Sequence, residues 1–389
     1  MERDEAIKLI QHLLVQMKTR GASDLFLTAG FPPAIKLDGE LTPVTDKPLT
    51  GQNSALLMRS LMSDRQLKEF ESTNECNFAI NPPAIGRFRV SAFVQMGQVG
   101  GVLRTITTDI PTFDQIALPA SLKDVVMAKR GLILMVGATG SGKSTSLAAM
   151  LGHRNANSKG HIITIEDPVE YVHPHLGCMI TQREVGSDTL SWDNALKNTL
   201  RQAPDVIQIG EIRTRETMEY AINFAETGHL VLSTLHANSA NQALDRIINF
   251  FSEEKREQVL MDLSLNLRAV ISQRLIRREV GGGRVPAVEI MLNSPLIADL
   301  IFKGEVVGIK EVMTRSTEQG MVTFDQYLFQ LFEAGTISYD EAVRNADSQN
   351  ELRLKVKLES RRMRENLLDD PAVRGLKMMA DDTAQLVRR

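Results

Sequence analysis

The residues best suited to chemistry in this sequence form a glycine-rich stretch that ends in a lysine and two hydroxyl side chains. It runs Gly137, Ala138, Thr139, Gly140, Ser141, Gly142, Lys143, Ser144 and Thr145. Glycines let backbone N–H groups turn toward phosphate oxygens, and a helix that starts here adds a positive dipole. Lys143 is placed to reach the β- and γ-phosphates, and Ser144 to bind Mg²⁺. The stretch predicts a site for a nucleoside triphosphate, ATP with Mg²⁺; the alternative is a glycine-rich connector.

Acidic residues follow two other apolar segments that have the length of buried strands. Glu211 ends the stretch 206–211, and Glu166 and Asp167 follow the stretch 162–165. At the carboxyl edge of a parallel sheet, such carboxylates can polarise water or hold Mg²⁺ indirectly. An ordinary strand end and a solvated turn fit the same residues, so the sequence leaves their role open.

Two histidines, His229 and His236, bracket a further short apolar segment. A histidine at the edge of a strand can donate a hydrogen bond to a phosphate and report its presence. A lone histidine more often has a structural role, and this alternative also stays open.

The first part of the chain predicts helices packed on one face of an antiparallel sheet. Apolar residues at helical spacing between residues 6 and 17 indicate a helix that Gly21 stops, and a second helical stretch lies near residues 55–70. The strand-like runs are 24–28, 34–37, 77–80, 87–93 and 101–105. We place this α+β domain at residues 1–105, followed by a proline-containing linker at 106–118.

From residue 119 onward, short apolar strands alternate with helical stretches, which predicts a mainly parallel α/β sheet. We place this core at residues 119–290. The stretch from Ser252 to Asn350 is expected to be mostly helical, interrupted by Gly281–Gly283, with a helical subdomain at 291–350. Residues 351–389 are dense in charge and predict a flexible tail.

The bulk composition excludes several classes of protein. The net charge of −3 disfavours a nucleic acid as the main partner. Two distant cysteines, Cys76 and Cys178, supply neither a disulfide framework nor a zinc site. No signal peptide is visible, and the longest apolar run is too short to cross a bilayer, so we expect a cytoplasmic protein that meets a membrane only through a partner.

Taken together, four segments resemble the secretion and pilus motor ATPases, whose members carry a Walker A motif, an acidic box, a Walker B motif and a histidine box in this order. The segments are GATGSGKST, ITIEDPVEYVH, APDVIQIGEIR and TGHLVLSTLHANSA. The resemblance implies an α/β fold with a P-loop (RecA-like) ATPase domain, a smaller N-terminal α+β (PAS-like) domain and a helical C-terminal region. It also implies a Mg²⁺-dependent ATPase.

The same resemblance implies a role for each site residue. Glu211 would orient the attacking water, Glu166 would assist it, and His229 would sense the γ-phosphate. Arg89 and Arg104, in the first domain, would reach the nucleotide. Without the resemblance, an ordinary surface position explains either arginine.

Within the family, the compact length and the missing four-cysteine module are similar to the type IV pilus retraction ATPases of the PilT/PilU family. The segment 294–305, Thr214 and Phe26 depart from the PilT pattern, whereas the runs at 324–326 and 345–348 and the charged tail look like the PilU branch.

This likeness implies a homo-hexameric motor that promotes pilus retraction and twitching motility. It would work with a PilT-like ATPase, peripherally at an inner-membrane pilus platform protein, with no nucleic acid involved. Two alternatives stay open: an ATP-binding accessory scaffold for a partner motor, and a DNA-transfer (conjugation) ATPase, which salt-sensitive DNA binding would support.

Overall fold

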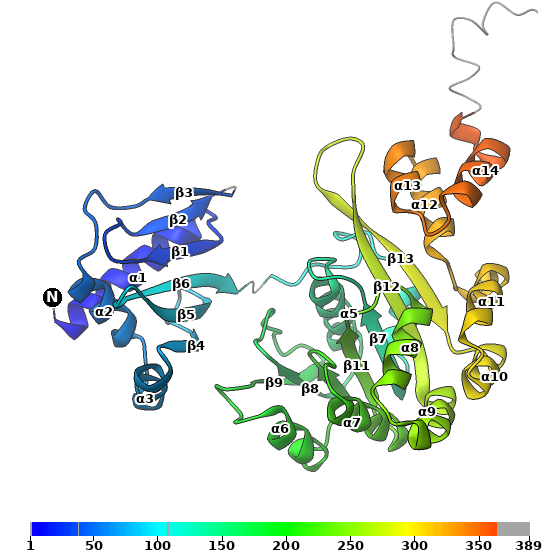
Figure 1. Ribbon diagram of the computed structural model, residues 1–389, viewed down its shortest axis with the longest axis horizontal. Helices are drawn as coiled ribbons and strands as arrows, with labels where there is room; N and C mark the ends of the chain where they lie inside the picture. The colour runs from blue at the N-terminus through cyan, green and yellow to red at the C-terminus, as the bar shows by residue number, and fades with distance from the viewer. Residues whose placement is uncertain (1, 38, 107–108, 364–389) are drawn as a thin grey trace, which may run out of the picture. The chain divides into compact units, whose positions relative to one another are not determined.

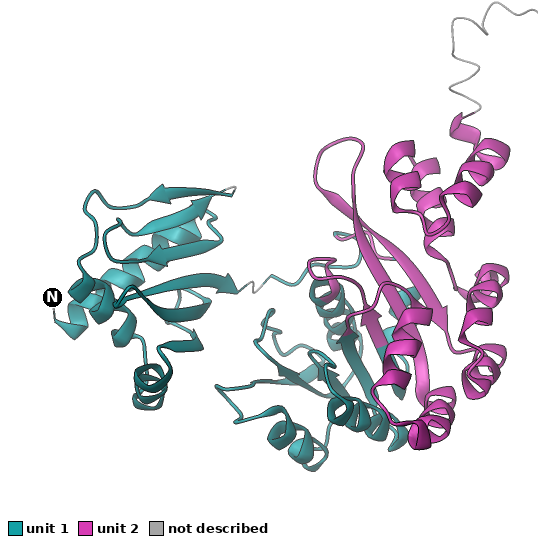
Figure 2. Ribbon diagram, in the orientation of Figure 1, with its two compact units in different colours: residues 1–115, 119–133, 144–234 teal, residues 116–118, 134–143, 235–389 magenta. Residues whose placement is uncertain are grey.

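The computed structural model describes residues 2–37, 39–106 and 109–363 of the chain (Figure 1). The Cα positions group into two compact units (Figure 2), which are described separately. The first unit comprises 1–115, 119–133 and 144–234, and the second comprises 116–118, 134–143 and 235–389. The domain boundaries predicted from the sequence stay predictions.

The N-terminal part of the first unit is an antiparallel sheet with helices packed on one face, which we call its inner face. In chain order its elements are α1 (Arg3–Thr19), β1 (Asp24–Leu27), β2 (Ala34–Leu37), β3 (Glu40–Pro43), α2 (Gly51–Ser60), α3 (Asp64–Thr73), β4 (Glu75–Ile80), β5 (Arg87–Gln95) and β6 (Gln98–Ile106). The strand order is β3-β2-β1-β6-β5-β4, and the strands pair antiparallel. This arrangement agrees with the predicted helices on one face of an antiparallel sheet.

Alternating side chains decide which face of this sheet is covered. On β5, Phe88, Val90 and Ala92 are buried, whereas Arg89 between them is exposed. The buried set packs in one cluster with apolar residues of α1 such as Leu14. The charged residues of β5 consequently lie on the outer face.

A second sheet carries the glycine-rich stretch. Its elements are α4 (Ser121–Val126), β7 (Gly131–Val136), α5 (Lys143–Asn157), β8 (Gly160–Glu166), β9 (Cys178–Glu184), α6 (Trp192–Thr199), β10 (Val206–Ile209), α7 (Arg215–Glu226), β11 (Leu230–Leu235), α8 (Ala240–Asn249), α9 (Glu253–Asn266), β12 (Leu267–Arg277) and β13 (Arg284–Leu292). The order is β13-β12-β7-β11-β10-β8-β9. β8 pairs parallel with β9 and β10, and β10 with β11, but β12 and β13 pair antiparallel, so the sheet is mixed.

The β12–β13 hairpin corrects the expectation that residues 252–350 are mostly helical. Most of both strands is buried, so the polar–apolar alternation that marks a half-exposed strand is absent. Gly281, Gly282 and Gly283 all have positive φ angles, which suit the turn between the two strands. They connect strands rather than interrupt a helix.

After β13, the described residues of the second unit are mostly helical, as expected for residues 291–350. The helices are α10 (Pro295–Lys303), α11 (Ile309–Arg315), α12 (Phe324–Glu333), α13 (Tyr339–Asn345) and α14 (Gln349–Glu359). Arg274 of β12 donates to Asn345 O at 2.7 Å and to Asp347 Oδ1 at 2.8 Å, which holds the end of α13 to the hairpin. The first residues of the predicted tail, 351–359, belong to α14. Residues 364–389 lie outside the described residues. No described helix is long and apolar enough to cross a membrane.

Candidate functional site

The glycine-rich loop joins the buried strand β7 to helix α5. Its glycines Gly137, Gly140 and Gly142 have φ angles of +153°, +76° and +87°, a region that other residues rarely adopt. The Nζ atom of Lys143 donates to Gly137 O at 2.8 Å and to Ala138 O at 2.9 Å. Two loop carbonyls thus bind the ammonium group, and its predicted contact with the phosphates stays a prediction.

Two glycines of the loop leave no room for a side chain. A Cβ atom at Gly142 would lie 2.8 Å from Gln273 Nε2, and one at Gly137 would lie 2.6 Å from Gln273 O. Ser141 Oγ is buried and has no hydrogen-bond partner among the described residues. A buried hydroxyl of this kind needs an acceptor, and a phosphate oxygen would supply one.

The half-buried Ser144 follows at the start of α5. The described residues hold no group of three or more His, Cys, Asp or Glu side chains suited to a metal. A Mg²⁺ ion here would therefore take oxygen ligands from Ser144 and from the phosphates, which is how this ion usually binds. The residues present fit that arrangement.

Glu166 lies in the first unit, at the carboxyl end of β8, and is 8% exposed. Thr164 Oγ1 donates to its Oε1 atom at 2.7 Å, and Gln182 Nε2 donates to the same atom at 3.2 Å. Burial raises the pKa of Glu166, and the hydrogen bonds from Thr164 and Gln182 oppose this shift. The side chain is held in one orientation and is expensive to ionise, which suits a group that handles a proton or a water.

Glu211 comes directly after β10, beside Glu166. The neighbouring register Ile209↔Ile165 and the 3.2 Å separation between a Cβ at Gly210 and Glu166 Cα place the two acidic residues at the same edge of the sheet. Arg213 forms an ion pair with the Glu211 carboxylate. The Nε and Nη2 atoms of Arg213 lie 2.7 Å and 2.6 Å from Glu211 Oε2. This guanidinium orients the carboxylate and competes with water for it.

His229 is not brought to this edge. It precedes β11, and its carbonyl accepts a hydrogen bond from Gly131 N, the first residue of β7. β11 spans six residues, or about 20 Å, and the opposite end of the strand meets Gly210 through Thr234 Oγ1 at 2.8 Å. The strand therefore separates His229 from the acidic residues, which corrects its expected role at the same chain's site. His236, just beyond β11, occupies the matching place at the carboxyl end.

Arg89 and Arg104 lie directly opposite each other on β5 and β6, both exposed. Arg104 Nε donates to Asp24 Oδ1 at 2.7 Å. Like charges opposite each other in a sheet are destabilising, and Asp24 offsets part of the repulsion. The pair offers two adjacent guanidinium groups to an anion, and their action on a nucleotide stays a prediction.

Sequence reasoning did not single out Gln273, Gln182 and Arg213. Gln273 and Gln182 each reach a site residue from a strand that is distant in sequence, at separations of 132 and 16 residues. The sequence carried no clear signal for Gln273, because Ser272 and Arg274 flank it and only the fold shows that its amide is buried and needs a partner. Arg213 was the basic residue two positions from the strand-end acid.

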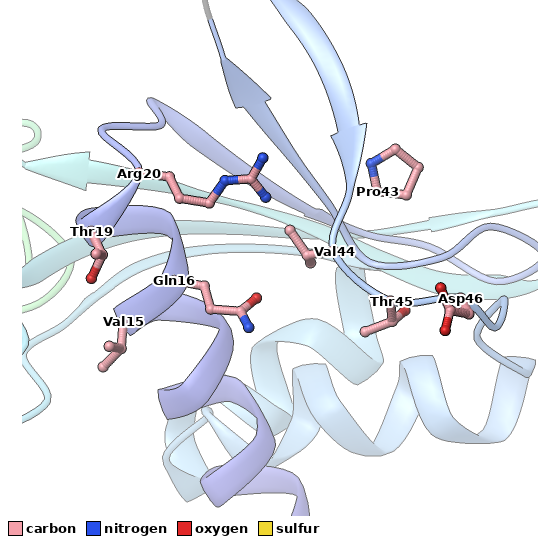
Figure 3. Close-up of a pocket in the computed structure, with 8 residues that line it drawn as sticks. All are labelled: Val15, Gln16, Thr19, Arg20, Pro43, Val44, Thr45 and Asp46. Carbon is pink, nitrogen blue, oxygen red and sulfur yellow. The ribbon is translucent and has the colours of Figure 1, made fainter.

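A separate open cavity of about 450 Å³ lies in the N-terminal part of the first unit (Figure 3). α1 supplies Gln16, Arg20 follows directly after this helix, and the segment after β3 supplies Thr45 and Asp46. It contains none of the predicted nucleotide-binding residues. One cation and one anion at its rim do not define a ligand.

Comparisons with known proteins agree with the loop and the sheet around it. Residues 2–367 match the family described as "Type II/IV secretion system protein". The chain is 55% identical to the Pseudomonas aeruginosa protein named type IV pilus ATPase PilU, over 96% of this chain and 98% of that protein. It is 43% identical to the type IV pilus retraction ATPase PilT of the same organism, over 86% and 96% of the two chains.

A solved structure of the pilus retraction motor PilT with bound ADP superposes with a TM-score of 0.83 at 38% identity, covering 89% of this chain and 99% of that one. Both the family match over residues 2–367 of this chain and the similarity over nearly the full length of these relatives lead to one conclusion. This chain belongs to the family of type II/IV secretion system proteins.

Proposed function

We propose that this chain is an ATP-hydrolysing motor that promotes type IV pilus retraction. The observation that carries the proposal is the phosphate-binding loop, in which Lys143 is bound to two loop carbonyls at the start of α5. The relatives named PilU and PilT support the assignment to pilus retraction.

The chain's residues divide the work of hydrolysis between binding and orientation. Lys143 exchanges its carbonyl partners for phosphate oxygens, and the loop N–H groups bind the remaining oxygens. Ser144 would hold Mg²⁺, which would supply positive charge that offsets the charge of the phosphates.

The carboxylates then act on the attacking water. Glu211 orients the water once the contact of its Oε2 atom with Arg213 opens or is shared. Glu166, whose pKa burial raises, takes up or returns a proton beside it.

The decisive experiment is ATP turnover by purified wild type and Glu211→Gln. The substitution removes the charge and basicity of the carboxylate while keeping its shape, so turnover should fall about 100-fold or more. The affinity for a fluorescent ADP analogue should stay within about threefold, because Glu211 does not bind the phosphates. Glu216→Gln, an exposed acid in the first turn of α7, is the matched control and should keep full turnover. Equal turnover in wild type and Glu211→Gln would refute the assignment.

The assembly and setting are also part of this proposal. We propose a homo-hexamer, working with a PilT-like ATPase at the cytoplasmic face of an inner-membrane platform protein. The segment 106–118 is proposed as the linker between the domain at 1–105 and the core at 119–290, with helical subdomain 291–350 and tail 351–389 following.

A second candidate function is an ATP-binding accessory scaffold for a partner motor, and the Glu211–Arg213 ion pair favours it. A carboxylate held in this way is not free to orient water. The two functions are distinguished by measuring pilus retraction in cells that carry Lys143→Ala in this chain and an intact partner motor. Lost or weakened retraction supports the motor, whereas unchanged retraction force supports the scaffold.

A further inference from the structure

Gln273 is a buried polar side chain on β12, between Ser272 and Arg274. It is 2% exposed, and the preceding Val270 and Ile271 are completely buried. Burying an amide is costly unless hydrogen bonds replace those made to water. The group that Gln273 hydrogen-bonds therefore explains why this position carries an amide and not an apolar side chain.

That partner is the glycine-rich loop. Gln273 Nε2 donates to Ser141 O at 2.7 Å, between the two glycines Gly140 and Gly142. The backbone of Gln273 also approaches the start of the loop, where a Cβ at Gly137 would lie 2.6 Å from Gln273 O. A single residue of β12 thus meets the loop at its first glycine, at Ser141 and at Gly142.

This contact determines which way one peptide unit of the loop faces. The carbonyl of Ser141 and the N–H of Gly142 belong to the same planar trans peptide, so they point in opposite directions. When Gln273 binds that carbonyl, the N–H of Gly142 is directed away from β12. Lys143 binds the carbonyls of Gly137 and Ala138 in the same way. With the carbonyls occupied, the loop N–H groups are oriented before any phosphate arrives.

We propose that Gln273 is a positioning residue of the nucleotide site, which holds the phosphate-binding loop in the conformation that receives the phosphates. It acts through Ser141 and Gly142 and not by touching the reacting atoms. The inference rests on the proposed nucleotide site and adds a residue that lies outside its sequence motifs. Preorganising donors in this way raises affinity because the loop loses less conformational freedom on binding.

The test compares full-length wild type with Gln273→Met, which keeps the length of the side chain and removes the amide donor. The Kd for a fluorescent ADP analogue should rise roughly tenfold, the loss expected for one hydrogen bond to a functional loop. The KM for ATP should rise more than kcat falls, because the loop binds phosphates and does not activate water. The melting temperature without nucleotide should fall by only a few degrees, because Ser141 O loses its amide donor.

Two further variants make the result specific. Gln273→Glu has nearly the same shape, but its ionised form offers no donor and repels both Ser141 O and the phosphates, so it should weaken ADP binding further than Gln273→Met. Ser272→Ala is the matched control: its hydroxyl donates to Glu289 Oε1 at 3.3 Å, and the side chain points to the other face of β12. This control loses one buried hydrogen bond on the same strand and should bind ADP as wild type does.

The proposal is overturned if Gln273→Met binds ADP like wild type, or if Ser272→Ala weakens binding equally. It is also overturned if Gln273→Met lowers the melting temperature while the folded protein, measured in the cold, keeps wild-type affinity, since that pattern describes a packing role. If wild type itself does not bind ADP, the proposed nucleotide site fails together with this role.

Discussion

At the scale of single residues, the loop offsets the cost of burying the Lys143 ammonium group before any nucleotide binds. An ammonium group that is 8% exposed would be costly without oxygen partners, and the carbonyls of Gly137 and Ala138 supply them. Nucleotide binding then replaces the carbonyl oxygens around Lys143 with phosphate oxygens. The ammonium group is already buried, so little water has to be removed from it. The glycines make this possible because they bring the carbonyls around the ammonium group.

Gly142 and Gly140 should respond differently to the same substitution. Both have positive φ, so an alanine at either position costs about 1–2 kcal/mol in backbone strain. A Cβ at Gly142 would also lie 2.8 Å from Gln273 Nε2, whereas no described atom lies within 4 Å of a Cβ at Gly140. Gly142→Ala should therefore lower the free energy of unfolding by about 1–3 kcal/mol more than Gly140→Ala, as measured by denaturant unfolding without nucleotide. Equal losses would show that Gln273 moves aside freely.

At the scale of elements, β9 fixes the segment that follows β8. Gln182 on β9 donates to Glu166 Oε1 and to Tyr171 O, and its Oε1 atom accepts from His173 N at 2.7 Å. Tyr171 in turn has its hydroxyl 2.9 Å from Thr145 Oγ1 at the end of the glycine-rich stretch. This segment therefore links the acidic residue to the first turn of α5.

His173, in this segment, should make stability depend on pH. Burial lowers its pKa from 6.5 to about 4. The unfolded chain therefore binds more protons than the folded chain between these values, so stability is complete above pH 6.5 and is lost as the pH falls toward 4. The loss should reach up to about 3 kcal/mol. Denaturant unfolding from pH 8 to pH 4 measures it.

The variant His173→Gln separates this titration from packing. At pH 8 the histidine is neutral in both states, so any difference from wild type there is the packing cost of the substitution. Between pH 6.5 and 4 the variant should lose less stability than wild type. Parallel curves for the two proteins would show that His173 is not the group responsible.

At the scale of the whole molecule, we propose that two chains of the hexamer together complete each nucleotide site. Arg89 and Arg104 lie together on the outer face of the first sheet, on a different part of the chain from the glycine-rich loop. If one chain supplies the arginines to its neighbour, Arg89→Ala and Lys143→Ala should each lose most of their ATP turnover alone. An arginine at a transferring phosphate contributes about 1,000-fold or more to kcat.

Mixing the two inactive variants tests this arrangement. Some sites in a mixed ring combine an intact Lys143 from one chain with an intact Arg89 from another, so part of the turnover should return. Each variant mixed with itself is the control and stays inactive. A mixture that is as inactive as its components would place both residues in a site made by one chain, or remove Arg89 from the site.

The sequence by itself determined the features that depend on neighbouring residues. The glycine-rich loop is recognisable because its glycines, lysine and serine act within nine consecutive positions, and the strand-end places of Glu166 and Glu211 follow from the short apolar runs before them. The first sheet was predictable in part for the same reason, since β4 and β5 alternate regularly, whereas the mostly exposed strand β3 was not predicted.

Only the tertiary structure decided what lies across the sheet. Gln273 meets Ser141 over a separation of 132 residues, and no local pattern identifies that pair. The β12–β13 hairpin was missed because burial on both faces erases the alternation that identifies a strand. His229 and His236 look alike in sequence, but the direction of β11 places His229 at the amino end and His236 at the carboxyl end where the acidic residues gather. The physical reason is common to all three: contacts between distant segments depend on strand order and direction, which the folded sheet alone specifies.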